Sequence, residues 1–356
     1  MRIVQMLPTL AYGDAIGNNV IAINDALVSA GYDTEIYAEG IDKKIPAGTA
    51  RNVSSYKDSG DTIILYHLST GTELNEKIKK FKARVFIIYH NVTPPEFWHG
   101  YDYEHEKRCE AGVESVKSLA KTPEYCIADS AFNKSDLERL GYTCPVDVLP
   151  ILIKFSDYEK KADQKTIERL SDSITNIVFT GRVAPNKKQQ DLITSFYYYH
   201  KFVNAKSRLI IAGSFQKSDI YYRKLDAYAK ALELEDSVEF TGHIPFEEIL
   251  AIYKTADVLL CLSEHEGFCV PLVEAMYFGI PIIAYDSTAI AETLGGSGLL
   301  LKDKDPKVVS EAINLVVTDG DLRAKMIEGE KERLKDFDND AIKQRLIEML
   351  KARTEG

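Results

Sequence analysis

Short apolar runs alternate with amphipathic stretches along nearly the whole chain. The runs are almost continuously hydrophobic, which is typical of parallel strands that are buried on both faces of a sheet. We therefore expect strands at Ile3–Leu7, Thr34–Tyr37, Thr62–Tyr66, Val85–Tyr89, Tyr125–Ala128, Val146–Leu149, Ile177–Phe179, Arg208–Ala212, Val238–Phe240, Val258–Leu262, Ile280–Ala284 and Gly298–Leu301.

The segments between these runs carry apolar residues at helical spacing. We expect helices at Asn18–Ala30, Asn133–Leu140, Gln189–Phe202, Ile220–Leu232, Phe246–Lys254, Pro271–Phe278 and Pro306–Val317, and one more amphipathic helix near the end of the chain. Strand, helix and strand in repeated alternation predict an α/β protein with parallel sheets and helices on both faces.

Two such series are expected, because 356 residues are many for a single hydrophobic core. The charged and polar segment after Pro150 separates them, and each series of about six strands suits one doubly wound, Rossmann-like domain. The boundary is placed between residues 152 and 153, which gives domains of 1–152 and 153–337.

Composition excludes several classes of protein. A net charge of −10 disfavours a nucleic-acid binder. The five cysteines are widely spaced, odd in number and without a C-x-x-C pair, which disfavours a disulfide framework and a structural zinc site. The chain has neither a signal-peptide pattern nor an apolar run of about 18 residues, so we expect a cytoplasmic protein.

The most specific segment is VLLCLSEHEGFCVPLVEAMYFGIPIIAYD, from Val258 to Asp286. A strand should end near Ser263, and Pro271 and Gly279 suit the first turn and the C-terminal end of a helix. This pattern places Glu266 on a loop and Glu274 early in the helix, at the carboxyl edge of a parallel sheet, where ligands bind.

Free backbone amides at the helix start, those of Phe268, Cys269 and Val270, favour an anion. Two carboxylates beside an anion site suit a nucleotide sugar, with one carboxylate on the ribose, the other on the sugar, and the amides on phosphate. The competing interpretation is two solvated glutamates on either side of an ordinary turn.

The segment resembles the Glu-x7-Glu signature of the retaining family-4 glycosyltransferases, which have the GT-B fold of two Rossmann-like domains that face each other across a cleft. Glu266-GFCVPLV-Glu274 followed by AMYFGIPIIA is close to the family's EGFGLPxxEAMxxGxPVIA, with Cys269 in place of a common glycine. The resemblance implies that the donor binds mainly to the second domain and the acceptor to the first. It also implies that the last helix returns to the first domain, so residues 338–356 are assigned there.

A second motif, from Gly181 to Lys188, directly follows the strand NIVFT and resembles the family's GR(L/V)xxxK segment. By that resemblance, Gly181 lies at the donor site, and Arg182 and Lys187 hold the donor diphosphate. Fixed cations could then neutralise the leaving group without a metal ion. Lys188 is the alternative to Lys187, and a solvated basic turn is the plain alternative to both.

The first strand leads into a loop with Gly13, Asp14 and Ala15 where the family commonly has adjacent glycines beside the donor phosphate. A helix should begin near Asn18 or Asn19. The spacing is not G-x-G-x-x-G, which disfavours a nicotinamide dehydrogenase.

His90 ends the strand VFIIYHN, and the resemblance directs it toward the transferred sugar, although a structural hydrogen-bonding role is the alternative. The aromatic stretch that follows offers Trp98 and Tyr101 as acceptor-binding residues or, equally, as a packed surface loop. The basic segment Glu73–Arg84 is interpreted as a solvated helix face, so membrane contact is at most peripheral.

The resemblance thus implies a retaining hexosyltransferase that uses a GDP-, UDP- or dTDP-linked donor and a saccharide or other hydroxyl acceptor, including lipid-linked acceptors, in polysaccharide or glycoconjugate synthesis. No cofactor and no metal are expected. In a front-face reaction Arg182 and Lys187 stabilise the leaving diphosphate, Glu266 orients the donor sugar, and His90 supports the developing charge. The rivals are a sugar-nucleotide epimerase of similar architecture and a nucleotide-sugar-binding protein without turnover.

Overall fold

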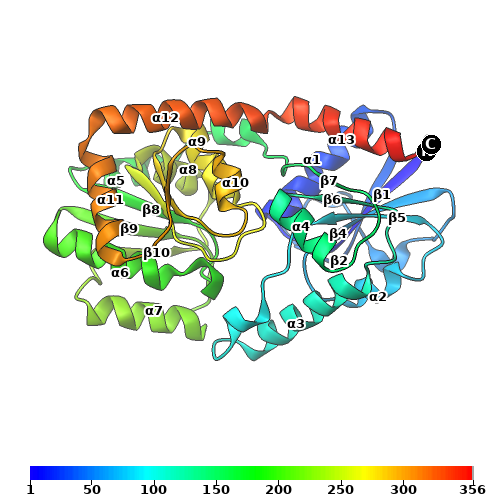
Figure 1. The fold of residues 1–356 in the computed structure, drawn as a ribbon, viewed down its shortest axis with the longest axis horizontal. Helices are drawn as coiled ribbons and strands as arrows, with labels where there is room; N and C mark the ends of the chain where they lie inside the picture. Colours follow the sequence, from blue (N-terminus) through cyan, green and yellow to red (C-terminus); the bar gives the residue numbers. More distant parts are fainter. Residues whose placement is uncertain (355–356) are drawn as a thin grey trace. The chain divides into compact units, whose positions relative to one another are not determined.

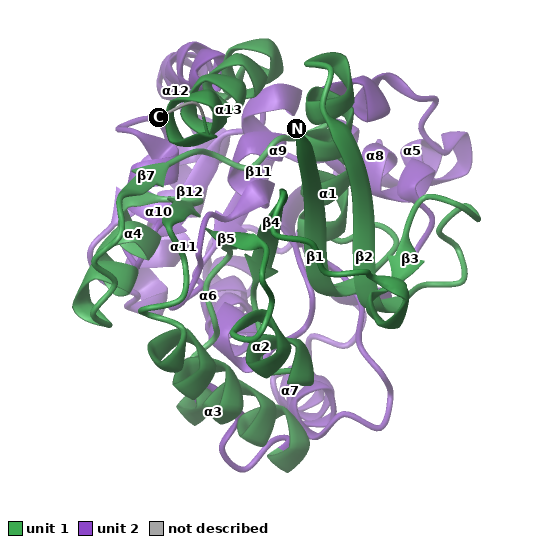
Figure 2. Ribbon diagram, turned by 90° about the vertical axis from the view of Figure 1, so that its right-hand side faces the viewer, with its two compact units in different colours: residues 1–96, 103–154, 337–356 green, residues 97–102, 155–336 purple. Residues whose placement is uncertain are grey.

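The computed structural model describes residues 1–354, and the chain divides into two compact units, shown in Figures 1 and 2. Unit 1 consists of Met1–Glu96, Tyr103–Lys154 and Phe337–Gly356, of which residues 355 and 356 lie outside the described part. Unit 2 consists of Phe97–Asp102 and Phe155–Asp336. Each unit is built on one parallel sheet.

The sheet of unit 1 has seven strands in the order β3-β2-β1-β4-β5-β6-β7, and every neighbouring pair is parallel. The strands are β1 (Arg2–Leu10), β2 (Asp33–Ile41), β3 (Arg51–Asn52), β4 (Thr62–Leu68), β5 (Arg84–Tyr89), β6 (Tyr125–Ala128) and β7 (Val146–Val148). The central strands β1, β4 and β5 are almost wholly buried, as their continuous apolar sequences predict.

Helices cover both faces of this sheet. On one face, Ile23 and Leu27 of α1 (Ala15–Ser29) and Leu346 of α13 (Asn339–Thr354) pack in one apolar cluster with Ile3 and Ile63. On the other face lie α2 (Glu73–Ile78), α3 (Tyr103–Ser118) and α4 (Ala131–Arg139). Alternate residues of the central strands β4 and β5 therefore contribute to two separate cores.

The terminal helix α13 belongs to unit 1 and packs against α1. Asn339 donates a 2.6 Å hydrogen bond to the carbonyl of Ile153, and Leu152 N–H donates to Asn19 at 3.0 Å. The start of α13 and the end of the segment Tyr103–Lys154 are therefore both hydrogen-bonded within unit 1. The assigned segment 338–356 ends in the two residues outside the described part.

The sheet of unit 2 has six strands in the order β10-β9-β8-β11-β12-β13, again all parallel. The strands are β8 (Thr175–Thr180), β9 (Ser207–Ala212), β10 (Val238–Gly242), β11 (Val258–Cys261), β12 (Ile282–Tyr285) and β13 (Leu299–Leu301). Its order reverses between β8 and β11, so the loops after these two strands diverge from a switch point, where α/β sheets bind ligands.

One face of this sheet is covered by α6 (Gln189–Phe202), α7 (Ile220–Ala231) and α11 (Pro306–Thr318), whose buried residues form one cluster with Ile177, Leu209 and Leu260. Buried helices α8 (Phe246–Thr255) and α9 (Val270–Phe278) contact β8 and β12. The remaining helices are α5 (Gln164–Leu170), α10 (Ile290–Leu294) and α12 (Gly320–Leu334).

Several details differ from the sequence-based expectations. Strand β3 and helices α5 and α10 were not among the expected elements. Helix α1 begins at Ala15, not near Asn18, because the Asp14 side chain caps it by accepting from Gly17 N–H. Helices α3 and α12 were not expected, since each buries few apolar side chains. Residues 97–102 group with unit 2, although the sequence placed them in the first domain, because Tyr101 packs against Tyr221 of α7.

Candidate active site

Two loops at the carboxyl edge of the unit 2 sheet bring together the charged residues of both sequence motifs. Lys187 ends a 3-10 turn (Pro185–Lys187) after β8, and Glu266 lies on the loop after β11. The Lys187 ammonium lies 2.5 Å from a carboxylate oxygen of Glu266. Lys187 therefore occupies the position beside Glu266, whereas Lys188 pairs with Glu264 at 2.9 Å.

Asn186 holds these two loops together, and the sequence analysis did not single it out. Its carbonyl accepts from Glu264 N–H at 2.9 Å, and its side-chain amide donates to the His265 carbonyl at 3.0 Å. The side chain is buried. The only sequence signal for Asn186 was its position directly before the motif lysine. This signal is weak, because asparagine is common in turns for other reasons.

The Lys187–Glu266 pair is shielded from solvent, with 22% and 9% of the two side chains exposed. Burial by itself would lower the pKa of Lys187, but the adjacent Glu266 carboxylate outweighs it, so the pKa is raised overall. Lys187 therefore remains a cation, which is the form that binds a diphosphate.

Arg182 lies on the same loop as Lys187 but is exposed, with its guanidinium carbon 5.5 Å from the centre of the Trp98 ring. Gln189 donates to the Arg182 backbone carbonyl at 3.1 Å, which fixes the chain on both sides of the turn. The structure thus joins Arg182 to the aromatic segment 97–102 and leaves its charge available to a ligand.

Gly181 has a φ of +140°, which favours glycine, and its carbonyl oxygen makes glycine necessary at Gly213. A Cβ atom on the neighbouring Gly213 would lie 1.9 Å from the Gly181 carbonyl oxygen, and Gly181 N–H donates to Ala212. The ends of β8 and β9 therefore approach so closely that two glycines face each other where the Arg182 loop begins.

Helix α9 begins next to this loop, with Pro271 in its first turn and Gly279, at φ +66°, as its C-cap. Phe268 and Cys269 are buried, and Thr293 donates to the Phe268 carbonyl at 2.5 Å. Val270 is the first residue of the helix. Anion binding by the amides at this helix start stays a prediction of the motif.

Glu274 is oriented differently from Glu266. Its two carboxylate oxygens accept from the hydroxyls of Tyr158 (2.7 Å) and Tyr253 (2.5 Å), and Tyr253 also contacts Thr180 at the end of β8. Burial raises the pKa of Glu274, while the two phenols lower it in part. The sequence did not point to either tyrosine, since both lie outside the motif.

In unit 1, Gly13 has φ +73°, Asp14 caps α1, and Ala15 is the first helical residue, all at the carboxyl end of β1. A Cβ at Gly17 would lie 2.6 Å from the Ala11 carbonyl oxygen, so this helix turn packs directly on the loop. Gly13 is thus the residue of this turn whose backbone conformation favours glycine, and a phosphate contact there stays a prediction.

His90 lies at the end of β5 with only 1% of its side chain exposed, so its ring is enclosed in unit 1. Its Nδ1 lies 2.8 Å from Asp129, and its Nε2 lies 2.8 Å from Nδ1 of His67, whose Nε2 contacts Gln5 at 2.9 Å. Burial holds the pKa of His67 well below its usual range, so His67 is neutral.

The donor and acceptor roles along this row of hydrogen bonds follow from Gln5, at its far end. Gln5 donates its amide N–H to the Val20 carbonyl, so its oxygen faces His67 and takes the Nε2 proton. Neutral His67 then accepts at Nδ1 from the Nε2–H of His90. The sequence signal for these hydrogen bonds was a polar residue, His67, within the apolar strand TIILYHL.

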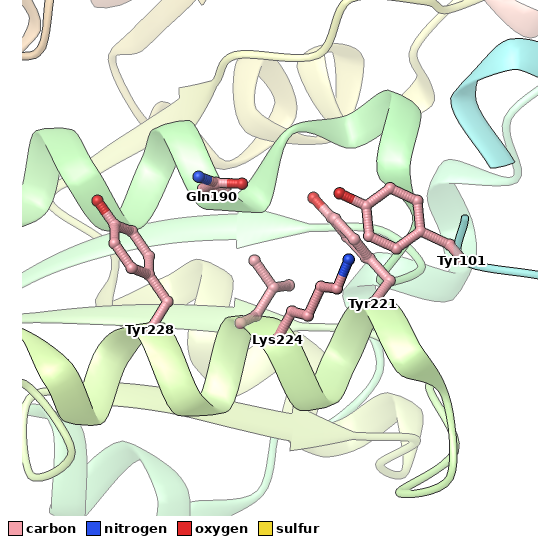
Figure 3. A pocket seen from close by; sticks show the side chains of 6 residues that line it. Tyr101, Gln190, Tyr221, Lys224 and Tyr228 are labelled. Atoms are coloured by element: carbon pink, nitrogen blue, oxygen red, sulfur yellow. The ribbon is translucent and has the colours of Figure 1, made fainter. Parts of the chain in front are cut away.

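Tyr101 lines a pocket of about 200 Å³ in unit 2, shown in Figure 3. The other lining residues come from α6 and α7: Gln190, Tyr221, Lys224, Leu225 and Tyr228. The Lys224 ammonium lies 4.6 Å from the centre of the Tyr101 ring. Aromatic faces beside a cation provide a surface for a polar, ring-shaped ligand.

Comparison with known proteins places these features in a family. Residues 160–333 match the family "Glycosyl transferases group 1". This part of the chain is a group 1 glycosyltransferase domain. The match contains both the Arg182–Lys187 loop and the Glu266–Glu274 segment.

Curated relatives agree with this family. The chain is 27% identical over 229 residues to a Campylobacter jejuni N-acetylgalactosaminyltransferase whose name specifies an undecaprenol-diphosphate-linked saccharide. It is 23% identical over 242 residues to O-antigen chain mannosyltransferase B of Escherichia coli. These matches cover 64% and 65% of this chain and 60% of each relative.

Solved structures show the same fold. Sucrose-phosphate synthase from Thermosynechococcus elongatus aligns with a TM-score of 0.77 at 16% identity, over 99% of both chains. HepE from Anabaena, solved with UDP-glucose, aligns with a TM-score of 0.77 at 16% identity, over 99% of this chain and 100% of HepE. The expected GT-B fold class and the resemblance to glycosyltransferases are confirmed. Among residues 1–354, no helix is long and apolar enough to cross a membrane.

Proposed function

We propose that the chain is a retaining, metal-independent hexosyltransferase that moves a sugar from a nucleoside-diphosphate donor to a hydroxyl acceptor. The observation that carries this proposal is the Lys187–Glu266 pair, which joins two motif loops at the switch point of a group 1 glycosyltransferase domain. The catalytic residues under this proposal are Lys187, Arg182, Glu266 and His90.

The leaving nucleoside diphosphate carries the charge that must be stabilised. Lys187 is a shielded cation, Arg182 is an exposed one on the same loop, and the α9 amides from Phe268 to Val270 add a helix N-terminus. Donors that are fixed before the reaction stabilise developing charge most effectively. With these groups in place, the diphosphate can depart without a metal ion.

Glu266 releases Lys187 to the diphosphate when the donor binds, and its carboxylate then accepts from sugar hydroxyls. Glu274 accepts from ribose hydroxyls in place of one tyrosine. His90 acts from within unit 1 through its hydrogen bonds to Asp129 and His67, because its ring is enclosed. The Gly13–Ala15 turn and Gly181 allow close approach of phosphate.

On the acceptor side, we assign Trp98 and Tyr101 to contacts with a saccharide. The support is the Tyr101 pocket in unit 2 and the stacking of Arg182 on Trp98. The named relatives act on a lipid-linked saccharide and on an O-antigen chain, which favours a glycan acceptor in polysaccharide or glycoconjugate synthesis. UDP-, GDP- and dTDP-linked hexoses are all candidates for the donor, and the neighbour solved with UDP-glucose favours UDP.

A thermal-shift panel of nucleotide sugars identifies the donor first, because a ligand that binds only the native state raises its stability. Transfer from that donor to an oligosaccharide acceptor is then followed with and without EDTA. Retained transfer in EDTA with an α-configured product from an α-configured donor supports the proposal. Epimerised donor in the absence of acceptor would instead identify an epimerase, and donor binding without any turnover would identify a binding protein.

A further inference from the structure

Three buried side chains with metal-ligating atoms meet beside the Lys187 ammonium. Cys261 is the last residue of β11, Glu266 lies on the following loop, and Cys269 is the N-cap residue of α9. The two sulfurs and a carboxylate oxygen all lie within 4.8 Å of one another. They come from within nine residues of chain, yet the tight loop turns them toward a common point.

The separation of the two sulfurs suits one small tetrahedral ion. Cys261 Sγ and Cys269 Sγ are 3.9 Å apart. Two thiolates that bind Zn²⁺ at about 2.3 Å with a tetrahedral angle are about 3.8 Å apart. The sulfurs therefore need almost no movement to bind the same ion, and the carboxylate of Glu266 can supply a third ligand.

The charge of the surroundings also suits such an ion. Two thiolates and one carboxylate carry one negative charge more than Zn²⁺ neutralises. The Lys187 ammonium, 2.5 Å from Glu266, offsets that charge. A ligating carboxylate that is held by a second group is the usual arrangement around bound metals.

Cys269 is in an unusual conformation for its residue type. Its φ of +74° and ψ of 66° lie in the left-handed region, which favours glycine. A side chain is therefore present at a position where it brings strain, and its sulfur lies beside a second thiol, that of Cys261.

We propose that Cys261, Cys269 and Glu266 form a binding site for Zn²⁺, with the fourth position open to water. On binding, the two thiols release their protons to solvent and the thiolates bond to the metal. The bound metal engages the carboxylate of Glu266 and thereby inhibits sugar transfer. This last consequence rests on the proposed function, whereas metal binding itself does not.

Binding is tested with Co²⁺ as a spectroscopic probe on the reduced, chelator-treated full chain. We expect a thiolate-to-cobalt charge-transfer band that saturates at one metal per chain and disappears on addition of Zn²⁺. Cys261→Ser should weaken Co²⁺ binding by roughly 10²-fold or more, because it removes a direct ligand. Cys261→Ala provides a second variant if the serine disturbs folding, with the thermal midpoint as a check.

The matched control is Cys144→Ser, which removes one thiol of the other close pair, Cys126 and Cys144, whose sulfurs are 3.6 Å apart. This variant should keep the cobalt band unchanged. Absence of the band in the wild type, equal binding by the folded Cys261 variants, or loss of the band in Cys144→Ser would each overturn the site.

The inhibitory consequence is measured separately. Zn²⁺ should lower the transfer rate of the wild type at least tenfold and leave Cys261→Ser active. A cobalt band without any transfer activity would contradict the proposed function but not the metal site. Normal transfer that Zn²⁺ leaves unchanged, despite a saturated band, would contradict the inhibition alone.

Discussion

Lys187 and Glu266 form a shielded ion pair with a separation of 2.5 Å, although they lie 79 residues apart in the chain. The pair joins the loop after β8 to the loop after β11, the two strands at which the sheet order reverses. Breaking one side of such a pair leaves the other charge partly buried and uncompensated, which is more costly than the pair's own net contribution to stability.

Lys187→Ala should lower the transfer rate by roughly 10²-fold or more at saturating donor, the scale observed when one preorganised charge stabiliser is removed. Arg182→Ala should have an effect of the same order. Lys188→Ala is the matched control, because Lys188 is adjacent in sequence but pairs with Glu264, and it should retain most activity. Steady-state kinetics with the identified donor measure all three. Comparable losses in Lys187→Ala and Lys188→Ala would show that the wrong lysine is assigned.

The sequence was sufficient for every strand except the short exposed β3 and for most buried helices, because their apolar periodicity is strong. It was insufficient for α3, where only Cys109, Gly112 and Val116 are buried, and for α12, where only Met326 and Glu330 are. A helix with so few buried positions has almost no apolar stripe for a pattern to reveal.

The candidate site shows a similar division. The motifs located Lys187 and Glu266, since each lies within a few residues of a strand end. They did not reveal Tyr158 and Tyr253, which hold Glu274 from outside the motifs, or the contact of Asn186, inside the second motif, with the His265 carbonyl. Such contacts depend on which loops the fold brings together, and spacing along one sequence does not contain that information.

Tyr101→Ala should raise the KM for the acceptor several-fold and leave the KM for the donor unchanged, because Tyr101 lines the pocket beside Lys224. Tyr103→Ala is the control, since Tyr103 lies two residues later and is 66% exposed. Kinetics with each substrate varied in turn make the measurement. A change confined to the donor KM would contradict the assignment of Tyr101 to acceptor binding.

Substitutions of the two motif glutamates should differ in their effect on nucleotide affinity. Glu274→Ala should weaken binding of the free nucleoside diphosphate and also destabilise the fold, because it removes the acceptor of the Tyr158 hydroxyl and one of the two side-chain partners of the Tyr253 hydroxyl, the other being Thr180. Each buried hydroxyl left unsatisfied costs roughly 1–3 kcal/mol. Glu266→Ala should leave diphosphate binding nearly intact while it lowers the rate of transfer, because its contact is with the sugar.

Titration calorimetry with the diphosphate and thermal unfolding of both variants distinguish these effects. Tyr253→Phe serves as a control for Glu274→Ala, since it removes one phenol and keeps the carboxylate. Equal loss of diphosphate affinity in the two glutamate variants would contradict the assignment of Glu274 to the ribose and Glu266 to the sugar.

Glu330 should make the stability of unit 2 depend on pH. This fully buried residue of α12 accepts a hydrogen bond from Ile282 N–H at 2.9 Å, and burial raises its pKa from 4.5 to about 8. The folded state therefore binds a proton more tightly than the unfolded state does. The resulting stabilisation is fully present below pH 4.5 and is lost as the pH rises through 8.

Glu330→Gln keeps an oxygen for Ile282 N–H and removes the titrating group. We expect the variant to be more stable than the wild type at pH 8, by an amount on the order of 2–4 kcal/mol, and to show a flatter dependence of stability on pH between 5 and 8. Glu328→Gln, at an exposed position on the same helix, should leave the dependence unchanged. Denaturant unfolding at several pH values makes the comparison, and parallel curves for the wild type and Glu330→Gln would show that Glu330 is ionised in the folded protein.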